Sequence, residues 1–411
     1  MRHDFTIVTV SGSVGKTSVK HVAANVLQQA GKRVRYQAGN YNDRVTVPLV
    51  LFDQPLPHLL NIFAWLRVFA ANERMIRRGP GVDVAVLELG TDGPGQIEQF
   101  AYLQPELAVV TAVTPEHMEF FADINAVAAE ELAVTKFAQK LLIAEDVPEQ
   151  YVQGITALRY GLSAKATYRA QPGAPTADGQ TITLTEQGSG SKQQAHIALL
   201  GSQGAKIALA GAATARELAI EWSKIIPALD AIEPVAGRMR LFHGAHGSTI
   251  IDDTYNASPE AVIAALDVLV SMPGSYKVLV LGGMNELGSF GMEAHREVAE
   301  AINERAIDLV VSVGELANKE MMPHLKQTTR RKVVQIFSAE RAGIFVREQL
   351  SDRKDAIVLC KGSQNGVFAE EAVKQLLLNP ADSARLVRQS SYWLGRKAPQ
   401  LYSLSLLDDR Q

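Results

Sequence analysis

The stretch Phe5-Thr-Ile-Val-Thr-Val-Ser-Gly-Ser-Val-Gly-Lys-Thr-Ser-Val-Lys20 carries the strongest signal in the chain. Its β-branched run from Phe5 to Val10 predicts a buried strand, and Gly15-Lys16-Thr17 opens a helix expected to reach Gln29. Strand, glycine loop, Lys-Thr and helix predict a phosphate-binding loop, with an ordinary glycine-rich turn as the alternative. Lys16 would reach the β- and γ-phosphates and Thr17 would hold Mg²⁺. The residues predicted to bind a nucleotide here are Gly12, Ser13, Gly15, Lys16, Thr17 and Ser18.

Composition excludes several classes of protein. The 411 residues are 47% hydrophobic and 21% charged with a net charge of −3, which predicts a globular protein without a broad basic surface for nucleic acid. Cys360 is the single cysteine, so internal disulfides and a cysteine zinc site are excluded and a cytoplasmic location is expected. The first strand begins within a few residues of Met1, so we expect no signal peptide.

The most apolar stretch covers residues 55–70. It is too short, and too interrupted by Asn61 and Arg67, to span a bilayer, so no integral membrane segment is predicted. Arginines follow it at 74, 77 and 78. We expect a helix over 56–78 that packs on its own domain, and a helix on a membrane surface is the alternative.

Strands and helices alternate over the first part of the chain. Apolar runs at 83–89 and 107–113 predict buried strands that end near Glu88 and His117, and residues 125–139 predict a helix. Alternation implies a mostly parallel sheet with ligands at the carboxyl ends of its strands. Residues 150–200 are expected to extend this domain with antiparallel strands, and a helix is expected over 205–224.

A second α/β pattern follows a predicted hinge at 234–238. We therefore divide the chain into an ATP-binding domain, residues 1–236, and a Rossmann-like domain, residues 237–411. The second domain is expected to close near residue 380, before a polar tail. Its expected strands cover 248–252, 277–281, 309–313 and 356–359.

Several side chains at strand ends suggest chemistry. Glu88 is placed to supply a second Mg²⁺ ligand, with a hydrogen bond to a nearby turn as the alternative. His117 could complete a second metal site, clamp a phosphoryl oxygen or be merely exposed. In the second domain a polar turn and a nearby arginine could grip a ribose or phosphate, and Lys361-Gly-Ser363 could hold a carboxylate; capping of turns is the alternative for each. The residues of that turn and arginine are Asp252, Asp253, Tyr255, Asn256 and Arg238.

These motifs, in order and over nearly the whole chain, resemble the Mur ligase family, and most closely its MurF-like branch. The blocks Asp252-Asp-Thr-Tyr-Asn256 and Met284-Asn-Glu-Leu-Gly288 are specific to that branch, and Val10 matches its short phosphate loop. The other blocks that carry the resemblance are Ser11–Thr17, Gly39–Asp43 with Val47-Pro48, Glu88–Gly90, Glu116–Glu119, Gly237-Arg238 and Lys361–Ser363.

The resemblance implies an ATP- and Mg²⁺-dependent ligase that forms an amide through an acyl phosphate. Its substrates would be a peptide-bearing acceptor carboxylate and an amino-acid or dipeptide amine. The roles it implies are as follows: catalytic, Lys16, His117, Glu131 and Arg238; metal, Thr17, Glu88 and His117; nucleotide, Asn40, Arg238, Asp253, Tyr255 and Asn256; substrate, Asn42, Lys361 and Ser363.

The chain departs from the family pattern in three ways. The N-terminal domain that holds a UDP-sugar in the family is not in this sequence, so we expect the sugar-binding surface to be missing, shifted to another surface or supplied by a partner. Glu131 stands where the family has a carbamylated lysine; it could supply the same negative charge without CO₂, or be a solvated helix residue beside Glu130. Gly201-Ser-Gln-Gly204 replaces a nucleotide-holding motif and Gly283 replaces an aspartate, so adenine recognition could be altered.

Three hypotheses follow. The first is a MurF-like ligase that adds D-alanyl-D-alanine or a similar amine to a muramyl peptide in peptidoglycan precursor synthesis. The second is a ligase of another amino-acid polymer, such as cyanophycin-like, polyglutamate or folyl-glutamate chains. The third is a nucleotide-binding protein without transfer chemistry.

Overall fold

The computed structural model describes the chain except for residues 1–4, 38–40, 80, 116–119, 286 and 410–411. The chain folds into two compact units. Unit 1 comprises Met1–Pro172, Ile182–Ile197 and Gly204–Ile232, and unit 2 comprises Gly173–Thr181, Ala198–Gln203 and Glu233–Gln411. The main division thus falls between Ile232 and Glu233, and two short segments from the first part of the chain belong to unit 2.

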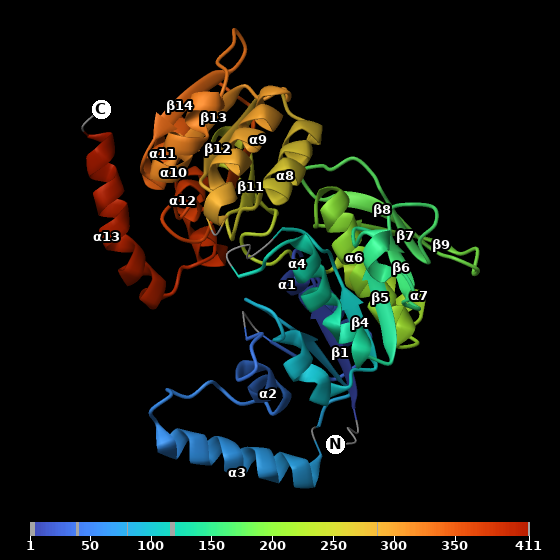
Figure 1. Ribbon diagram of the computed structural model, residues 1–411. Coiled ribbons are helices and arrows are strands. Elements are labelled where there is room, and N and C mark those ends of the chain that lie inside the picture. Colours follow the sequence, from blue (N-terminus) through green and yellow to red (C-terminus); the bar gives the residue numbers. More distant parts are fainter. Residues whose placement is uncertain (1–4, 38–40, 80, 116–119, 286, 410–411) are drawn as a thin grey trace. The chain divides into compact units, whose positions relative to one another are not determined.

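Unit 1 is built on a nine-stranded sheet in the order β2-β3-β1-β4-β5-β6-β7-β8-β9 (Figure 1). Neighbouring strands from β2 to β7 run parallel, and β8 is antiparallel to β7. The predicted α/β class with a mostly parallel sheet is confirmed. The strands are β1 (Thr6–Ser11), β2 (Val34–Tyr36), β3 (Val84–Glu88), β4 (Leu107–Val110), β5 (Lys140–Ala144), β6 (Leu158–Gly161), β7 (Tyr168–Pro172), β8 (Gln180–Glu186) and β9 (Lys192–Ile197).

The central strands of unit 1 are short apolar runs buried on both faces, as parallel strands between helices require. One face packs against the η1 and α4 region, where Ile97, Phe100 and Val127 join Ile7, Leu87 and Val110 of the strands. The helices are α1 (Lys16–Gln29), α2 (Thr46–Leu51), α3 (Ile62–Arg78), η1 (Ile97–Leu103), α4 (Ile124–Glu131), η2 (Leu132–Lys136), α5 (Glu149–Val152), α6 (Gly201–Glu217, begun in unit 2) and α7 (Trp222–Asp230).

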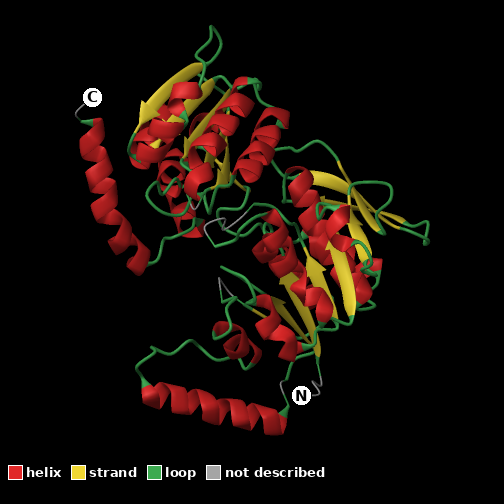
Figure 2. Ribbon diagram, in the orientation of Figure 1, coloured by secondary structure: helices red, strands yellow, loops and turns green. Residues whose placement is uncertain are grey.

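Unit 2 contains a six-stranded sheet in the order β10-β11-β15-β12-β13-β14, with only the β10–β11 pair antiparallel. Alternate residues of β12 serve two separate cores, Leu279 and Leu281 on one face and Val278 and Val280 on the other. Helices therefore cover both faces (Figure 2), as the Rossmann-like prediction requires. The strands are β10 (Arg240–His243), β11 (Thr249–Asp253), β12 (Lys277–Gly282), β13 (Leu309–Val313), β14 (Lys332–Ile336) and β15 (Ile357–Lys361). The helices are η3 (Ala245–Gly247), α8 (Pro259–Ser271), η4 (Gly288–Phe290), α9 (Gly291–Asn303), α10 (Gly314–Glu320), η5 (Met322–His324), α11 (Ala339–Gln349), α12 (Glu370–Leu376), η6 (Pro380–Arg385) and α13 (Ser391–Asp408).

Two sequence predictions about helices after residue 200 were wrong. The helix expected over 205–224 breaks after Glu217, because Ala219 adopts a left-handed φ of 59° before α7 begins. The polar tail expected beyond residue 380 is instead the 18-residue helix α13. Its Lys397 is buried and bonds the carboxylates of Glu370 and Glu371, a tertiary contact that the local pattern does not reveal.

Candidate functional site

The phosphate loop of unit 1 connects β1 to α1 through two glycines in the left-handed region. Gly12 has a φ of 116° and Gly15 a φ of 90°, conformations that favour residues without a Cβ. A Cβ on Gly12 would lie 2.4 Å from Oγ1 of Thr111, which follows β4. The loop is thus pressed against the neighbouring strand, and both glycines are required by the backbone.

The start of α1 offers backbone donors to a ligand. Within the described part of the chain, the N–H groups of Gly15, Thr17 and Ser18 have no hydrogen-bond partner, and no side chain caps the helix. Ser13 N–H is bonded to Ala112 O at 2.9 Å, which holds the loop in place. Because unpaired N–H groups and the helix dipole both favour negative charge, this end of α1 is suited to a phosphate.

Lys16 lies over the loop with its ammonium group directed at backbone oxygens. Its Nζ donates to the carbonyl oxygens of Gly12 and of Ser13, the latter at 3.2 Å, and lies 3.8 Å from Oε1 of Glu131. The Lys16 side chain is 14% exposed. The cation is therefore held over the loop by its backbone oxygens and remains partly exposed.

Glu131 and Glu130 have separate roles at the end of α4. Glu131 is buried, and its Oε2 accepts a hydrogen bond from Gly12 N–H at 2.6 Å. The alternative of a solvated residue is wrong. Glu130 points instead to the turn after β3, where it accepts from Gly95 N–H and from Ile97 N–H at 2.7 Å. One glutamate fixes the phosphate loop and its neighbour fixes a turn.

Glu88, at the end of β3, gathers polar groups around its carboxylate. Thr17 Oγ1 donates to its Oε1 at 3.2 Å, and Asn42 Nδ2 lies 3.4 Å from the same oxygen. Lys20, which the sequence reasoning missed, places its buried Nζ 2.9 Å from Oε2. Its position one turn after Lys16 on a strand-facing helix was the available signal. A hydroxyl and a carboxylate are hard oxygen donors, so Thr17 and Glu88 fit the chemistry of Mg²⁺.

Asn40 and His117 lie outside the described residues, so their predicted roles stay predictions. Over the described ranges, no group of three or more histidine, cysteine, aspartate or glutamate side chains is arranged to hold a metal ion.

In unit 2, an ion pair joins the ends of two adjacent strands. Asp253 of β11 and Lys361 of β15 are register partners, and Lys361 Nζ lies 2.5 Å from Asp253 Oδ2. Lys361 also donates to Asn256 O at 2.9 Å, and Asp253 Oδ1 accepts from Met239 N–H. Lys361 does hold a carboxylate, but that carboxylate belongs to its own chain.

Asp252 is buried beside this pair. Its carboxylate accepts from Thr254 Oγ1 at 2.5 Å and from Gly237 N–H at 3.2 Å. Burial is the main cause that raises the pKa of Asp252 to about 6, and the neighbouring Asp253 charge adds to it. This carboxyl therefore serves the turn rather than a ligand.

The guanidinium of Arg238 lies 4.3 Å from the centroid of the Tyr255 ring. Its Nε is buried without a hydrogen-bond partner among the described residues. Arg388, which the sequence reasoning missed, donates to Thr254 O at 2.6 Å and pairs with Glu370. Arg388 therefore stabilises the turn after β11. Arg238 lies beside the same turn and has a donor, its Nε, that no described residue uses.

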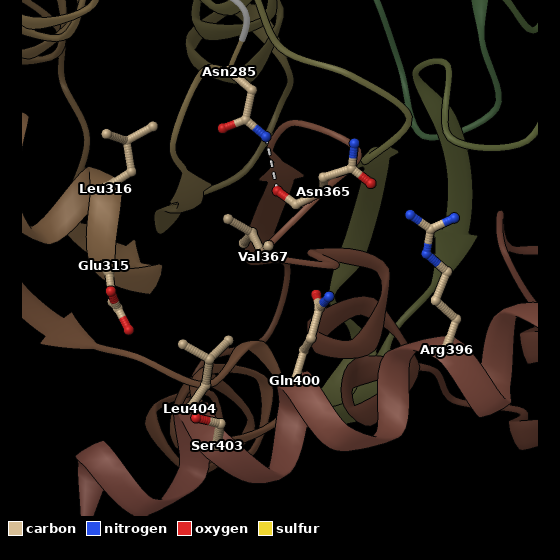
Figure 3. Close-up of a pocket in the computed structure, with 10 residues that line it drawn as sticks. Asn285, Glu315, Leu316, Asn365, Val367, Arg396, Gln400, Ser403 and Leu404 are labelled. Carbon is tan, nitrogen blue, oxygen red and sulfur yellow. Dashed lines mark hydrogen bonds between the residues drawn. The ribbon is translucent and has the colours of Figure 1, made fainter.

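Ser363 and a cavity complete this edge of unit 2. Ser363 is fully buried, with its Oγ accepting from Asn285 N–H and donating to Ala257 O. The cavity, of about 520 Å³, lies between strand ends and α13 (Figure 3). Asn285 donates to Asn365 O at 2.8 Å on one wall. The cavity is lined by Asn285, Glu315, Leu316, Asn365, Gly366, Val367, Arg396, Gln400, Ser403 and Leu404.

Family models and sequence relatives both match the chain to Mur ligases. Residues 10–215 match the family model of the Mur ligase middle domain, and residues 237–364 match that of the Mur ligase glutamate ligase domain. The UDP-N-acetylmuramoyl-tripeptide–D-alanyl-D-alanine ligase of Escherichia coli is 29% identical over 392 residues, which cover 91% of this chain and 77% of that enzyme.

Solved structures agree in fold. MurF from Acinetobacter baumannii superposes with a TM-score of 0.72 at 20% identity, covering 87% of this chain and 74% of that one. The MurF ligase of Thermotoga maritima, solved in complex with ADP, gives a TM-score of 0.71 at 21% identity and covers 91% and 81%.

Proposed function

Because the chain belongs to the Mur ligase family of ATP-dependent amide ligases, we propose that it is a MurF-like enzyme of peptidoglycan precursor synthesis. It would join a carboxylate of a muramyl peptide to the amine of D-alanyl-D-alanine or a similar dipeptide. The observation that carries the proposal is the phosphate loop, with unpaired N–H groups at Gly15, Thr17 and Ser18 beside Lys16. The 29% identity to the E. coli ligase supports the choice of substrates.

The proposed reaction has two steps. An acceptor carboxylate oxygen attacks the γ-phosphorus of ATP, ADP leaves, and an acyl phosphate forms. The amine nitrogen then attacks the acyl carbon, loses a proton, and phosphate leaves as the amide forms. Lys16 and the N–H groups of α1 would bind the phosphate oxygens and offset their charge. Thr17 and Glu88 would hold Mg²⁺, which supplies further positive charge there.

In unit 2, we propose that Arg238 binds a nucleotide phosphate, with Asp253, Tyr255 and Asn256 positioning it. The buried, unpartnered Nε of Arg238 supports this role. Lys361 would act mainly by forming an ion pair with Asp253 and so holding that carboxylate in position. His117 as a second metal ligand, Asn40 at the nucleotide, and Asn42 and Ser363 at substrate remain proposals from the resemblance.

The amine substrate needs a site with both signs of charge. The cavity beside α13 is lined by the carboxylate of Glu315, the guanidinium of Arg396 and the amides of Asn285, Asn365 and Gln400. An ammonium group and a carboxylate on one small molecule match these donors and acceptors. We therefore propose this cavity for the amino-acid or dipeptide amine.

The test measures phosphate release from ATP with muramyl tripeptide and D-alanyl-D-alanine, each alone and together, and identifies the amide by mass spectrometry. We expect release only when both are present, and release about 10²–10³-fold slower with Lys16→Ala. Rapid ATP hydrolysis with neither substrate would overturn the proposal. Glu315→Gln should raise the KM for the amine and leave that for ATP unchanged.

A second candidate is a ligase of another amino-acid polymer. The family model that matches residues 237–364 is described as a glutamate ligase domain, and this description favours the second candidate. Activity with glutamate and a polyglutamate, folyl-glutamate or cyanophycin-like acceptor, and none with muramyl peptide, would select it. A protein without transfer chemistry would instead keep its cellular function in the Lys16→Ala variant.

A further inference from the structure

Helix α3 and the segment before it expose an unusual amount of apolar surface. Phe63 is 78% exposed, Leu60 84% and Phe69 63%. Leu59, Ile62 and Leu66 are also more than half exposed, and Val68 is the one buried residue among the described positions of α3. The expectation that this helix packs its apolar residues on its own domain was therefore wrong. Figure 1 shows α3 at the margin of unit 1, with only one face toward it.

The exposed side chains form two stripes. At 100° per residue, Ile62, Leu66, Phe69 and Ile76 fall on one line along the helix, which the exposed Glu73–Arg77 pair interrupts. Phe63 falls beside the arginines that follow. Arginines 67, 74 and 78 fall on a second line, which is also exposed. The described residues supply no acidic partner for these three arginines, whereas Arg77 is paired with Glu73 at 2.9 Å. The solvent side of α3 is thus mainly apolar along one edge and mainly cationic along the other.

We propose that α3 (Ile62–Arg78), with the exposed segment before it, is an interfacial helix that binds unit 1 to a bilayer surface carrying anionic lipids. The apolar stripe consists of long aliphatic and aromatic side chains, which enter the boundary between headgroups and acyl chains. The arginine stripe complements the negative charge of the headgroups. Asn61 Oδ1 accepts from Ala64 N–H at 3.0 Å and so stabilises the first turn of the helix. No helix in the described parts of the chain is long and apolar enough to cross a membrane. This inference goes beyond the proposed ligase activity and does not depend on it.

The test is co-sedimentation of the full chain with phosphatidylcholine vesicles, with and without phosphatidylglycerol. We expect binding to the anionic vesicles that weakens with salt. Phe63→Ser with Phe69→Ser should reduce the partition coefficient about 10²-fold, because two buried aromatic side chains are lost. Replacing Arg67, Arg74 and Arg78 by glutamine should reduce it about fivefold per arginine, and only for anionic vesicles.

Matched controls come from exposed residues elsewhere. Tyr402→Ser, on α13, removes an equally exposed aromatic ring, and Lys165→Gln removes an exposed cation of unit 1; neither should change binding. The altered side chains are exposed, so melting temperatures should stay unchanged, as should phosphate release without vesicles. Absence of vesicle binding, or binding that the α3 variants leave intact, would overturn the proposal. So would a dimer in light scattering that the phenylalanine variant dissociates and that binds no vesicle.

Discussion

Each unit places a lysine beside a carboxylate at the carboxyl edge of its parallel strands, but the two lysines are held differently. Lys361 is buried in unit 2, with Asp253 at 2.5 Å and Asn256 O at 2.9 Å. Lys16 in unit 1 is partly exposed, with Glu131 only at 3.8 Å, and it lies beside N–H groups that have no partner among the described residues. The same pair of residue types thus gives a closed structural contact in one unit and an open anion site in the other.

The difference shows which observations separate a structural ion pair from a binding site. Both units have a lysine near the carboxyl edge of their parallel strands, so residue type and general location do not decide. What differs is whether the donors are already used: Lys361 has strong partners, whereas the start of α1 keeps free N–H groups. If this distinction is right, the two lysines should fail in different ways when they are removed.

Lys361→Met should mainly cost stability. It leaves the Asp253 carboxylate buried without its cation, and breaking a buried pair in this way lowers the free energy of unfolding by about 3–5 kcal/mol. Urea denaturation measures the loss. Asp253→Asn in the same chain should recover part of it, because the uncompensated charge is then gone. A Lys361→Met chain with unchanged stability and lost activity would reverse the comparison.

Lys16→Ala should mainly cost activity. Removing a cation that offsets developing phosphate charge is expected to lower kcat about 10²–10³-fold, as for other electrostatic donors. The melting temperature should stay near that of the unaltered chain, because Lys16 is partly exposed and the Glu131 carboxylate keeps its hydrogen bond from Gly12 N–H. Phosphate release and calorimetry on the same preparation check both. A large fall in melting temperature would show that Lys16 is structural like Lys361.

The burial of Asp252 at the strand ends of unit 2 should make the free energy of unfolding depend on pH. The pKa of Asp252 is raised from 3.8 to about 6, so the folded chain binds this proton more tightly than the unfolded chain. The associated stability is present below about pH 4 and is lost as pH rises through 6, by up to about 3 kcal/mol. Denaturation between pH 4 and 7 should show this slope, and Asp252→Asn should remove its share of it. An identical slope in both chains would contradict the burial argument.

The sequence predicted the elements that rest on local pattern. The apolar strands, the phosphate loop and the α/β class of both units follow from hydrophobic periodicity and glycine placement. What it missed depends on contacts between residues distant in sequence. Lys20 forms an ion pair with Glu88, and Lys397 holds α13 in place through an ion pair with Glu370. The exposure of α3 was also hidden, because an apolar helix looks the same in sequence whether it is covered or not.

Glu131 and Glu130 allow the finest test of the open site, because adjacent residues should give opposite results. Glu131→Gln keeps an oxygen to accept from Gly12 N–H but removes the charge facing Lys16. If that charge replaces the family's carbamate, ATP binding should change little, turnover should fall about tenfold, and removal of CO₂ should not affect the unaltered chain. Glu130→Gln should instead lower the free energy of unfolding by about 1–3 kcal/mol, because the new NH₂ group cannot accept the hydrogen bonds that Glu130 takes from the N–H groups of Gly95 and Ile97. Turnover should not change. Equal turnover in the two variants would reduce Glu131 to an anchor of the loop, and the open site would then depend on Lys16 and the N–H groups alone.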